Sequence, residues 1–371
     1  MQSNNPNDIS GKGALIGMCN PLIDIIATIE QDFLQKYNLK ANDAILAEEK
    51  HLPMLVLTLH VVIPLRKILT FFFSYDEMIE KFDVEYAAGG AGQNSLRGAQ
   101  RILPPNSTIF IGCASDDKYG RELKKAATAD GLEVAYCIDE TTPTGTCATL
   151  ISGHDRSLVT NLAAANNYKF EHLKSPEIWA KVEAAKIFYI TGYFITVSTQ
   201  SILEVAKHAA EQNKIFCMNI SAPFIPQFFT KDFQSISPYW DVLFGNESEA
   251  EAFSDAIELG TKDLKKIALH IAQLPKANTS RPRMVIITHG PKETIVAIND
   301  EIRTFAVPPV PVEEIVDCNG AGDAFVGGFL GQYILGKPLE KCIDAGHWLA
   351  GQVIRKSGAV YPEGDLSKML N

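Results

Sequence analysis

The sequence lacks the cysteine and histidine spacings that usually hold metals or form catalytic disulfides. Its seven cysteines include no Cys-x-x-Cys pair, and its eight histidines are scattered rather than grouped with them. These absences argue against a zinc site and against a thioredoxin-like redox motif, so we expect reduced thiols in a cytosolic protein. The first residues also lack the basic and apolar regions of a signal peptide. This favours a cytoplasmic location, with a nuclear pool left open.

An excess of positive charge is absent too. With 34 Lys and Arg against 44 Asp and Glu, the net charge is −10. A nucleic acid is therefore disfavoured as the main partner, because phosphate backbones are bound by a basic face. A single nucleotide is not excluded, since it needs only a few local donors.

Short apolar runs that end in small or polar residues recur along the 371 residues, at 14–20, 108–117, 186–194, 214–223, 241–249 and 284–290. Helix-like stretches such as 198–212 and 264–274 lie between them. This alternation predicts an α/β fold with a doubly wound, mostly parallel sheet flanked by helices. Ligands of such sheets bind beyond the carboxyl ends of the strands. Four of the runs have a polar residue toward their carboxyl ends, where such a site would be built, namely Asn20, Asn219, Asn246 and Thr288.

Two other stretches have a different pattern. Residues 137–162 alternate threonine with apolar residues, as a β-hairpin does, and residues 22–50 with 82–86 also look strand-rich. We expect them to form a small β lid over the site. The predicted large α/β domain then comprises 1–21, 87–136 and 163–371, and the predicted lid domain comprises 22–86 and 137–162.

The string VDCNGAGD at 316–323 comes directly before an apolar, helix-like run. Backbone N–H groups of Gly320, Ala321 and Gly322 at a helix start would form an anion site. Asp323 in the first helical turn could then take a proton from an attacking hydroxyl. The alternative is a tight turn with an acid that stabilises the helix. The order of anion hole and base favours the functional interpretation.

A second glycine-rich string, GGAGQN, occupies 89–94. Gly89 and Gly90 would let the backbone approach a ligand, and Asn94 follows one helical turn later. The string resembles a dinucleotide-binding fingerprint only weakly, because Ser95 stands where the last glycine belongs. Taken alone, it leaves helix packing and ligand contact equally open.

Together, a GGxxxN string near the front and a DxNGAGD string near the end resemble the ribokinase-type family of carbohydrate and nucleoside kinases. Further matches narrow the resemblance to the members that phosphorylate adenosine, and they cover nearly the whole chain. These matches lie at 17–25, 42–51, 143–151, 155–168, 190–198, 219–225, 243–250 and 319–330. The resemblance implies a ribokinase-like fold and an ATP-dependent transfer to the 5′-hydroxyl of adenosine. AMP and ADP would be the products, as in purine salvage.

The resemblance also implies roles for single residues at the nucleoside end of the site. Asp323 would be the general base, with Asn319, Gly320, Ala321 and Gly322 as the anion hole. Asp24, aided by Asn20, would accept hydrogen bonds from the ribose 2′- and 3′-hydroxyls. The other residues implied to contact the nucleoside are Gly89, Gly90 and Asn94 at the ribose and Tyr193, Leu46 and Leu158 at the adenine. Each of these also has an interpretation as core or turn.

At the phosphate end, the resemblance implies that Asn246 and Glu249 hold Mg²⁺ with its waters. Arg156 would come from the lid as a cation for the phosphoryl charge. Further residues implied on the ATP side are Thr288, Gly290 and His347. The chain departs from the family at Cys318, where threonine is usual, and at Ala91, where a small polar residue is usual. We expect both departures to change KM rather than abolish the chemistry.

Residues 52–74 are the part of the chain least like that family. Pro53, Pro64, Arg66 and Lys67 interrupt the apolar run, which falls short of the about 20 residues that a membrane span needs. No stable membrane association is expected. The Phe-Phe-Phe-Ser at 71–74 could be a translated pyrimidine tract at an intron end. We interpret the segment as a translated intron whose removal would replace 54–74 by one isoleucine, with a genuine apolar insertion as the alternative.

Other functions remain open at this stage. A related sugar or nucleoside kinase would use the same Asp323 machinery, and competition by adenosine would separate the two. A non-catalytic nucleoside-binding or regulatory protein, or a membrane-tethered form using 52–74, belongs to a different class. The expected partners are the small molecules adenosine and ATP, and the expected state is a monomer.

Overall fold

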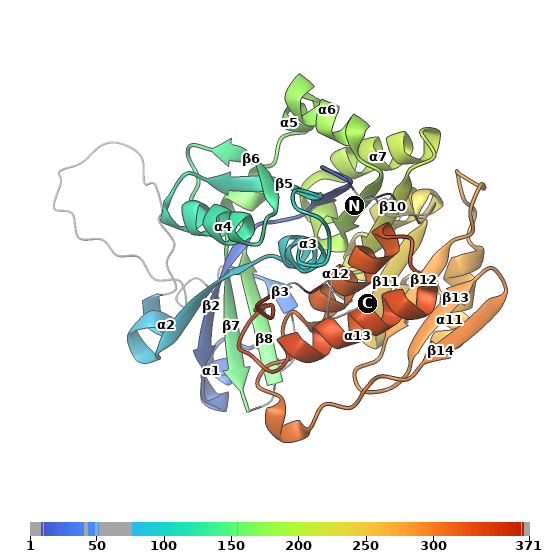
Figure 1. Ribbon diagram of the computed structural model, residues 1–371. Coiled ribbons are helices and arrows are strands. Elements are labelled where there is room, and N and C mark those ends of the chain that lie inside the picture. The colour runs from blue at the N-terminus through green and yellow to red at the C-terminus, as the bar shows by residue number, and fades with distance from the viewer. Residues whose placement is uncertain are drawn as a thin grey trace.

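A computed structural model, drawn in Figure 1, gives the architecture of the chain. It describes residues 9, 11–40, 44–48, 51, 76–153, 155–364 and 366. Residues 52–74 lie outside this part of the chain, so their interpretation stays a hypothesis. The described residues form one nine-stranded sheet and one five-stranded sheet. No helix among them is long and apolar enough to cross a membrane.

The nine-stranded sheet, called here the large sheet, has the strand order β14-β13-β12-β11-β10-β9-β1-β5-β6. Its strands are β1 Leu15–Met18, β5 Thr108–Ser115, β6 Glu133–Asp139, β9 Ile187–Thr191, β10 Ile215–Asn219, β11 Val242–Asn246, β12 Met284–Thr288, β13 Thr294–Ile298 and β14 Glu301–Phe305. Pairing is parallel from β6 to β12 and antiparallel at β13 and β14. The predicted doubly wound, mostly parallel sheet is confirmed.

The direction in which the strands are added reverses between β1 and β9. From β1 the sheet grows through β5 to β6 on one side, and from β9 it grows through β10 to β12 on the other. Connections therefore diverge on opposite faces at this point and leave a crevice beyond the strand ends. Asn20 follows β1 there, and Tyr193 follows β9.

Helices cover both faces of the large sheet (Figure 1). One face is packed by α3 Ala91–Gln100, α4 Lys118–Ala129, α12 Ala321–Ile334 and α13 Leu339–Val353. The other is packed by α5 Phe170–Lys174, α6 Pro176–Ala184, α7 Ile195–Glu211, α8 Phe224–Phe228, α9 Thr230–Ile236, α10 Glu247–Ala256 and α11 Leu264–Gln273. The strands are apolar nearly throughout because both of their faces are buried. The two predicted helical stretches correspond to α7 and α11.

The five-stranded sheet, called here the small sheet, has the order β3-β8-β7-β2-β4. Its strands are β2 Leu22–Thr28, β3 Ala44–Leu46, β4 Val84–Gly89, β7 Thr146–Ser152 and β8 Asp155–Asn161, and the antiparallel pair β7–β8 is the predicted hairpin. Along β2, Ile23 and Ile25 pack under the helices α1 Gln31–Lys36 and α2 Asp76–Lys81. Side chains alternate across a strand, so Asp24 between them points to the opposite face.

Two strands, β6 and β4, extend beyond the domain boundaries that the sequence predicted. β6 pairs with β5 along its whole length to Asp139, so 137–139 lie in the large sheet rather than in the predicted lid. β4 pairs with β2 as far as Gly89, so 87–89 lie in the small sheet. Both differences arise because ladder hydrogen bonds continue to the last residue that a neighbouring strand can pair.

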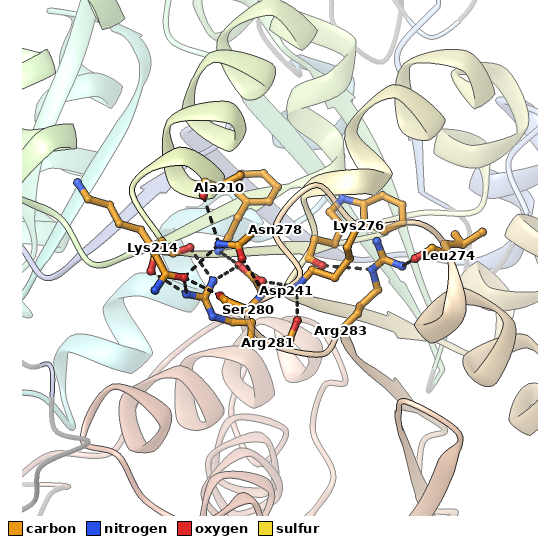
Figure 2. Close-up of polar contacts among 12 residues, drawn as sticks. Ala210, Lys214, Asp241, Leu274, Lys276, Asn278, Ser280, Arg281 and Arg283 are labelled. Atoms are coloured by element: carbon orange, nitrogen blue, oxygen red, sulfur yellow. Dashed lines mark hydrogen bonds and ion pairs between the residues drawn. The ribbon is translucent and has the colours of Figure 1, made fainter.

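The end of the large sheet away from the crevice is fixed by a buried polar network (Figure 2). Asp241, just before β11, accepts hydrogen bonds from the backbone of Phe216 at 2.9 Å and from Lys276 at 2.6 Å. Arg283, 1% exposed, donates to the carbonyls of Ile271, Leu274 and Ser237. The carbonyl oxygens satisfy the N–H groups of the guanidinium, and the nearby Asp241 charge favours its charged form.

Candidate active site

A pocket of about 310 Å³ lies where the crevice of the large sheet meets the small sheet. Asn20, Tyr193 and Asn246 reach it from strand ends of the large sheet, and Asp24 and Leu158 reach it from the small sheet. A site of this size suits a small organic ligand. The predicted polar strand ends are thus brought together.

The start of α12 forms one wall of the pocket. Gly320 is its N-cap with φ +73°, a left-handed conformation that favours glycine. Asn319, Gly320, Gly322 and Asp323 line the pocket, whereas Ala321, which was also predicted for the anion hole, is not among the described lining residues. A Cβ atom at Gly322 would meet nothing within 4 Å, so the missing side chain leaves open space beside the helix terminus. Such a terminus is an anion site by its dipole and its N–H groups.

The Asp323 carboxylate faces this space from the first turn of α12. Asn94 Nδ2, in the first turns of α3, donates to Asp323 Oδ2 at 3.1 Å. Burial by the surrounding protein raises the pKa of Asp323 to about 7, although the Asn94 hydrogen bond opposes the shift. A carboxylate with a pKa near 7 can both accept and release a proton at neutral pH. Asn94 therefore contacts the candidate base, Asp323. Its contact with a ribose stays a prediction.

Asp317 organises the loop before α12. Its carboxylate accepts hydrogen bonds from the backbone of Asn319 at 2.7 Å and of Gly358 at 2.8 Å, and it forms an ion pair with Arg156 of β8. Arg156 therefore connects the small sheet to the loop and lies behind it, outside the pocket lining that the described residues form. The role predicted for Arg156, contact with a transferring phosphoryl group, stays a prediction.

Asn20 and Asp24 form the polar end of the pocket nearest the small sheet. Asn20 is 2% exposed, and among the described residues neither its amide nitrogen nor its amide oxygen has a hydrogen-bond partner. Burial, and next the charge of Asp323, raise the pKa of Asp24 to about 7. Buried polar atoms without partners are costly, so this pair is suited to a ligand that supplies hydroxyl groups.

The glycine pair beside them is required by space. A Cβ atom at Gly89 would lie 2.4 Å from both Asp24 carboxylate oxygens. One at Gly90, whose φ is +89°, would lie 2.3 Å from the Asn20 carbonyl oxygen. The structure thus explains both glycines through their contact with the polar end.

Apolar side chains close the far end of the pocket. Tyr193, Leu46 and Leu158 all line it, and the Tyr193 ring lies 6.1 Å from the ring of Phe224. Their contact with adenine stays a prediction. Ser221, which sequence reasoning missed, holds the Tyr193 backbone with a hydrogen bond of 3.3 Å. Its φ of +76° marks a strained turn, for which the sequence carries no signal.

Cys147 and Thr160 are two further lining residues that sequence reasoning missed. Thr160 Oγ1 donates to Cys147 Sγ at 3.3 Å across β7 and β8. The Thr-rich alternation at 137–162 pointed to strands without telling which face meets the pocket. Register alone fixes that face.

Asn246 and Glu249 meet through a capping box at the start of α10. Asn246 Oδ1 accepts from the Glu249 backbone at 2.9 Å, and Asn246 Nδ2 donates to Glu249 Oε1 at 2.9 Å. Both line the pocket, and burial raises the pKa of Glu249 to about 7. Among the described residues, no group of three or more His, Cys, Asp or Glu could hold a metal by itself.

The three residues predicted on the ATP side are only partly brought together. Thr288 ends β12 and lines the pocket, whereas Gly290 and His347 are not among the described lining residues. His347, 8% exposed, shares a 2.8 Å hydrogen bond with Thr294 Oγ1 and packs on the Phe325 ring. His347 therefore packs against α12 through Phe325. Its ATP-side role stays a prediction.

Comparison with known proteins agrees with this geometry. Residues 55–365 match the pfkB family of carbohydrate kinases. Adenosine kinase 1 of Arabidopsis thaliana is 49% identical over 352 residues, which are 95% of this chain and 96% of that protein. The chain belongs to the adenosine kinases of the pfkB family. The family predicted from the sequence is confirmed, and with it the kinase class of the enzyme.

Further relatives extend the similarity. The adenosine kinase of Schizophyllum commune is 44% identical over 93% of this chain and 95% of its own length. Anopheles gambiae adenosine kinase in complex with P1,P4-di(adenosine-5) tetraphosphate superposes with a TM-score of 0.88 at 46% identity, covering 95% of this chain and 100% of that one. Schistosoma mansoni adenosine kinase in complex with adenosine and AMP has a TM-score of 0.84 at 35% identity, covering 95% and 98%. The predicted ribokinase-like fold is confirmed.

Proposed function

We propose that this chain transfers the γ-phosphoryl group of ATP to the 5′-hydroxyl of adenosine, giving AMP and ADP. The observation that carries the proposal is the pairing of Asp323 with an open helix terminus in one pocket with Asp24 and Tyr193. A base, an anion site, a polar acceptor pair and an aromatic wall are the parts that a nucleoside kinase needs. The membership of the family supports the same reaction.

Asp323 acts as the general base in this proposal. Its carboxylate takes the proton of the 5′-hydroxyl, the oxygen attacks the γ-phosphorus, and the bond from that phosphorus to the β-phosphate oxygen breaks. Asn319, Gly320, Ala321 and Gly322 stabilise the charge on the transferring group through the helix terminus. Asn94 orients the base by its hydrogen bond to Oδ2.

Asp24 and Asn20 bind the ribose diol. A carboxylate offers two oxygens to two neighbouring hydroxyls, and the unpartnered amide of Asn20 completes the set. Gly89 and Gly90 leave room for the sugar beside them. Tyr193 stacks on the adenine, with Leu46 and Leu158 on its other side. Stacking of a base on an aromatic ring contributes about 1–3 kcal/mol to binding, whichever base is bound.

The residues at the other end of the pocket suit a nucleotide that carries Mg²⁺. Mg²⁺ keeps several waters and takes few protein oxygens, so the buried Glu249 carboxylate fits it as an acceptor for those waters. Asn246 holds Glu249 in place through the capping box. When bound, the ion neutralises negative charge on the phosphates. Thr288 belongs to the ATP-side wall in this proposal. The ATP-side roles of Gly290 and His347 and the phosphoryl contact of Arg156 belong to the proposal as well, although these three residues are not among the described lining residues.

In this proposal the small sheet acts as the lid of the site, and the division into a large domain and a lid domain belongs to the proposal. Lid closure excludes water, which otherwise accepts the phosphoryl group. The enzyme works as a monomer in the cytoplasm. Size-exclusion chromatography and cell fractionation test these two statements.

Sugar specificity provides the direct test of the substrate. We expect ADP release with adenosine to exceed release with ribose or with 3′-deoxyadenosine by more than about tenfold in kcat/KM, because a site built for hydroxyls penalises their loss. Asp24→Asn should remove most of the discrimination between adenosine and 3′-deoxyadenosine. Asp116→Asn, the same change at an exposed acid outside the pocket lining, serves as the matched control. Equal turnover of ribose and adenosine would overturn the proposal.

A further inference from the structure

Cys113 and Cys137 lie directly opposite each other on the adjacent strands β5 and β6. Both are free thiols and belong to the same face of the large sheet, where Cys113 is 1% exposed and Cys137 is partly buried. Neighbouring strands lie about 4.8 Å apart, and disulfides join residues whose Cα atoms are about 4.4–6.8 Å apart. The pair therefore has the spacing of a disulfide without a movement of the strands.

The surroundings of Cys137 favour its thiolate. The neighbouring Cys113 thiol, and next the backbone and the ammonium group of Lys169, favour the Cys137 thiolate, against the opposing effects of burial and of the Asp139 charge. These contacts lower the pKa of Cys137, whereas the same thiol–thiol contact raises the pKa of Cys113. Cys137 is also the more exposed of the two and lines the second cavity described below. Thiolates are the reactive form of cysteine, so Cys137 is assigned as the nucleophile and the buried Cys113 as the resolving thiol.

A second cavity of about 310 Å³ gives a small oxidant access to the pair. Cys113, Cys137, Thr141, Asn167 and Lys169 line it, together with the acids Asp139 and Glu140 and the side chain of Ile138. No described residue lines both this cavity and the pocket of the candidate active site. The pair is thus accessible without passing through the nucleoside site.

The other thiols lack these contacts. Burial raises the pKa of Cys342 to about 12 and raises that of Cys217. The pKa of Cys318 is also raised, although the residue is exposed. Partial loss of hydration of its thiol is the larger cause, and the charge of Asp317 is the next. Cys342 is therefore a suitable internal control for a reactive Cys137.

We infer that Cys137 and Cys113 form a redox modification site whose reactant is a small hydroperoxide. The Cys137 thiolate attacks one peroxide oxygen, the O–O bond breaks, and hydroxide or an alkoxide leaves, so that Cys137 becomes a sulfenic acid. Cys113 then attacks the Cys137 sulfur. The S–O bond breaks, the S–S bond forms, and the hydroxyl leaves as water with the Cys113 proton. The two thiols lose two electrons to the peroxide, and a thiol reductant reverses the change.

The site is coupled to the connection between the two sheets. Asp139, two residues after Cys137, accepts hydrogen bonds from the Thr141 and Thr142 backbones at 2.8 and 3.0 Å and from the Asn167 side chain at 2.6 Å. These contacts join the crossing from β6 to β7 with the helix that follows β8. A disulfide would fix the end of β6 to β5 without moving the strands, and so would restrict the connection through which the small sheet moves. We expect a change in KM for adenosine larger than the change in kcat.

The test is peptide mapping of the full-length protein after brief treatment with hydrogen peroxide and alkylation. A Cys113–Cys137 cross-linked peptide that disappears with dithiothreitol is expected. Without peroxide, Cys137 should react with iodoacetamide on the order of tenfold faster than Cys342 at neutral pH. Both readouts are independent of kinase activity. Oxidation confined to Cys318, with no such cross-link, would overturn the inference.

Single variants separate the two roles. In Cys113→Ser, the sulfenic acid at Cys137 persists and is trapped by dimedone, whereas in Cys137→Ser the other thiol remains unlabelled. Cys342→Ser is the matched control and should form the cross-link as the unmodified chain does. Equal dimedone labelling of Cys113 and Cys137 would contradict the assignment of nucleophile and resolving thiol. Circular dichroism confirms that each variant is folded, and the unmodified chain alone decides whether the disulfide exists.

Discussion

Three carboxyl groups share the pocket, the buried Asp24 and Glu249 and the partly buried Asp323. The pKa of each is raised to about 7, chiefly because burial removes hydration that favours the charged form. The groups also repel one another, since Asp323 contributes to the shift of both others. A bound ligand that donates hydrogen bonds or positive charge relieves this repulsion. Repulsion among these carboxyl groups therefore favours ligands that donate hydrogen bonds or carry positive charge.

The first prediction concerns the pH dependence of the rate. Asp323 must be deprotonated to accept the hydroxyl proton, so kcat/KM should fall below its pKa of about 7. We expect a decrease of at least tenfold per pH unit, because Asp24 and Glu249 take up protons in the same range. Initial rates from about pH 5 to about pH 9 measure it. A rate independent of pH across neutrality would contradict the role of Asp323.

The second prediction concerns stability. A carboxyl group whose pKa is higher in the folded state binds more protons there than in the unfolded chain. Its contribution to stability therefore decreases as pH rises from about 4 to about 7. Asp323→Asn should remove this penalty, since a shift from 3.8 to about 7 corresponds to at most about 4 kcal/mol and contact with the open pocket reduces it. We expect a gain on the order of 1–3 kcal/mol at pH 8.

Urea denaturation of the variant and the unmodified chain measures this gain. Repeating it near pH 4 is the internal control, because both folded forms are then neutral at this position and the difference should vanish. A gain of equal size at both pH values would mean that packing, rather than charge, causes it.

Single residues were predictable from the sequence where the signal is local. Asp323 and the glycines before it lie within one short string, whose order already points to an anion hole and a base. The contact of Asn94 with Asp323 joins residues 229 positions apart, and no spacing in the sequence reports it. The ion pair of Arg156 with Asp317 is of the same kind. Asp317 was visible in the string, but its role depends on three partners that folding brings together.

At the scale of elements, α3, α12 and α13 pack closely because glycines face their neighbours. A Cβ atom at Gly327 would lie 2.6 Å from the Ser95 carbonyl oxygen of α3. One at Gly328 would lie 2.4 Å from the Ala345 carbonyl oxygen of α13. Because α12 also carries Asp323 and the anion hole, the spacing of these helices sets the position of the catalytic groups.

The third prediction follows from this packing. Gly328→Ala should destabilise the protein by about 1–3 kcal/mol, as overpacking of a core does, and should lower kcat because α12 shifts. Gly351→Ala in α13 is the matched control, since its Cβ atom would meet Val310 and Arg355 at 3.6 and 3.7 Å, ordinary contact distances. Alanine there favours the helix by up to about 1 kcal/mol. Thermal unfolding and steady-state kinetics of both variants measure the effects, and equal behaviour of the two would refute the packing argument.

The existence and type of most elements followed from periodicity. The apolar runs became the parallel strands of the large sheet, because strands covered on both faces are apolar nearly throughout. Strand ends were less predictable. β6 continues to Asp139 because β5 offers pairing partners that far, and a neighbour distant in sequence cannot be read from the strand itself. The left-handed Ser221 that supports Tyr193 was likewise invisible.

For the whole molecule, the relation between the two sheets decides whether a site exists. Asp24 and Leu158 come from the small sheet, and Asp323 and Tyr193 come from the large-sheet side. Two connections near each other tie the sheets together. In the first, the Asn167 side chain donates a hydrogen bond to Asp139. In the second, the Thr144 backbone and hydroxyl donate to Asp117 at the start of α4, at 2.8 and 2.7 Å. The sequence indicated two domains, but their mutual placement depends on such contacts.

The fourth prediction concerns residues 54–74, which lie outside the described part of the chain. If this segment is a translated intron, a chain in which it is replaced by one isoleucine should have a kcat/KM at least equal to that of the full-length protein. The reason is that an apolar run which does not belong to the working protein raises the tendency of the chain to aggregate. Kinetics and light scattering of the two chains measure this. Loss of activity in the shortened chain, with its fold retained, would favour a genuine insertion.

The measurement that tests the central claim most directly is ADP release from ATP and Mg²⁺ with adenosine, for the unmodified chain and for Asp323→Asn. We expect turnover that requires adenosine, and a decrease in kcat on the order of 10²–10⁴-fold in the variant. Adenosine binding, followed by calorimetry, should remain within about threefold because Asp24 and Asn20 are intact. Turnover by the variant at the unmodified rate would contradict the assignment of Asp323 as the base. Adenosine binding without turnover in either protein would contradict the proposed reaction itself.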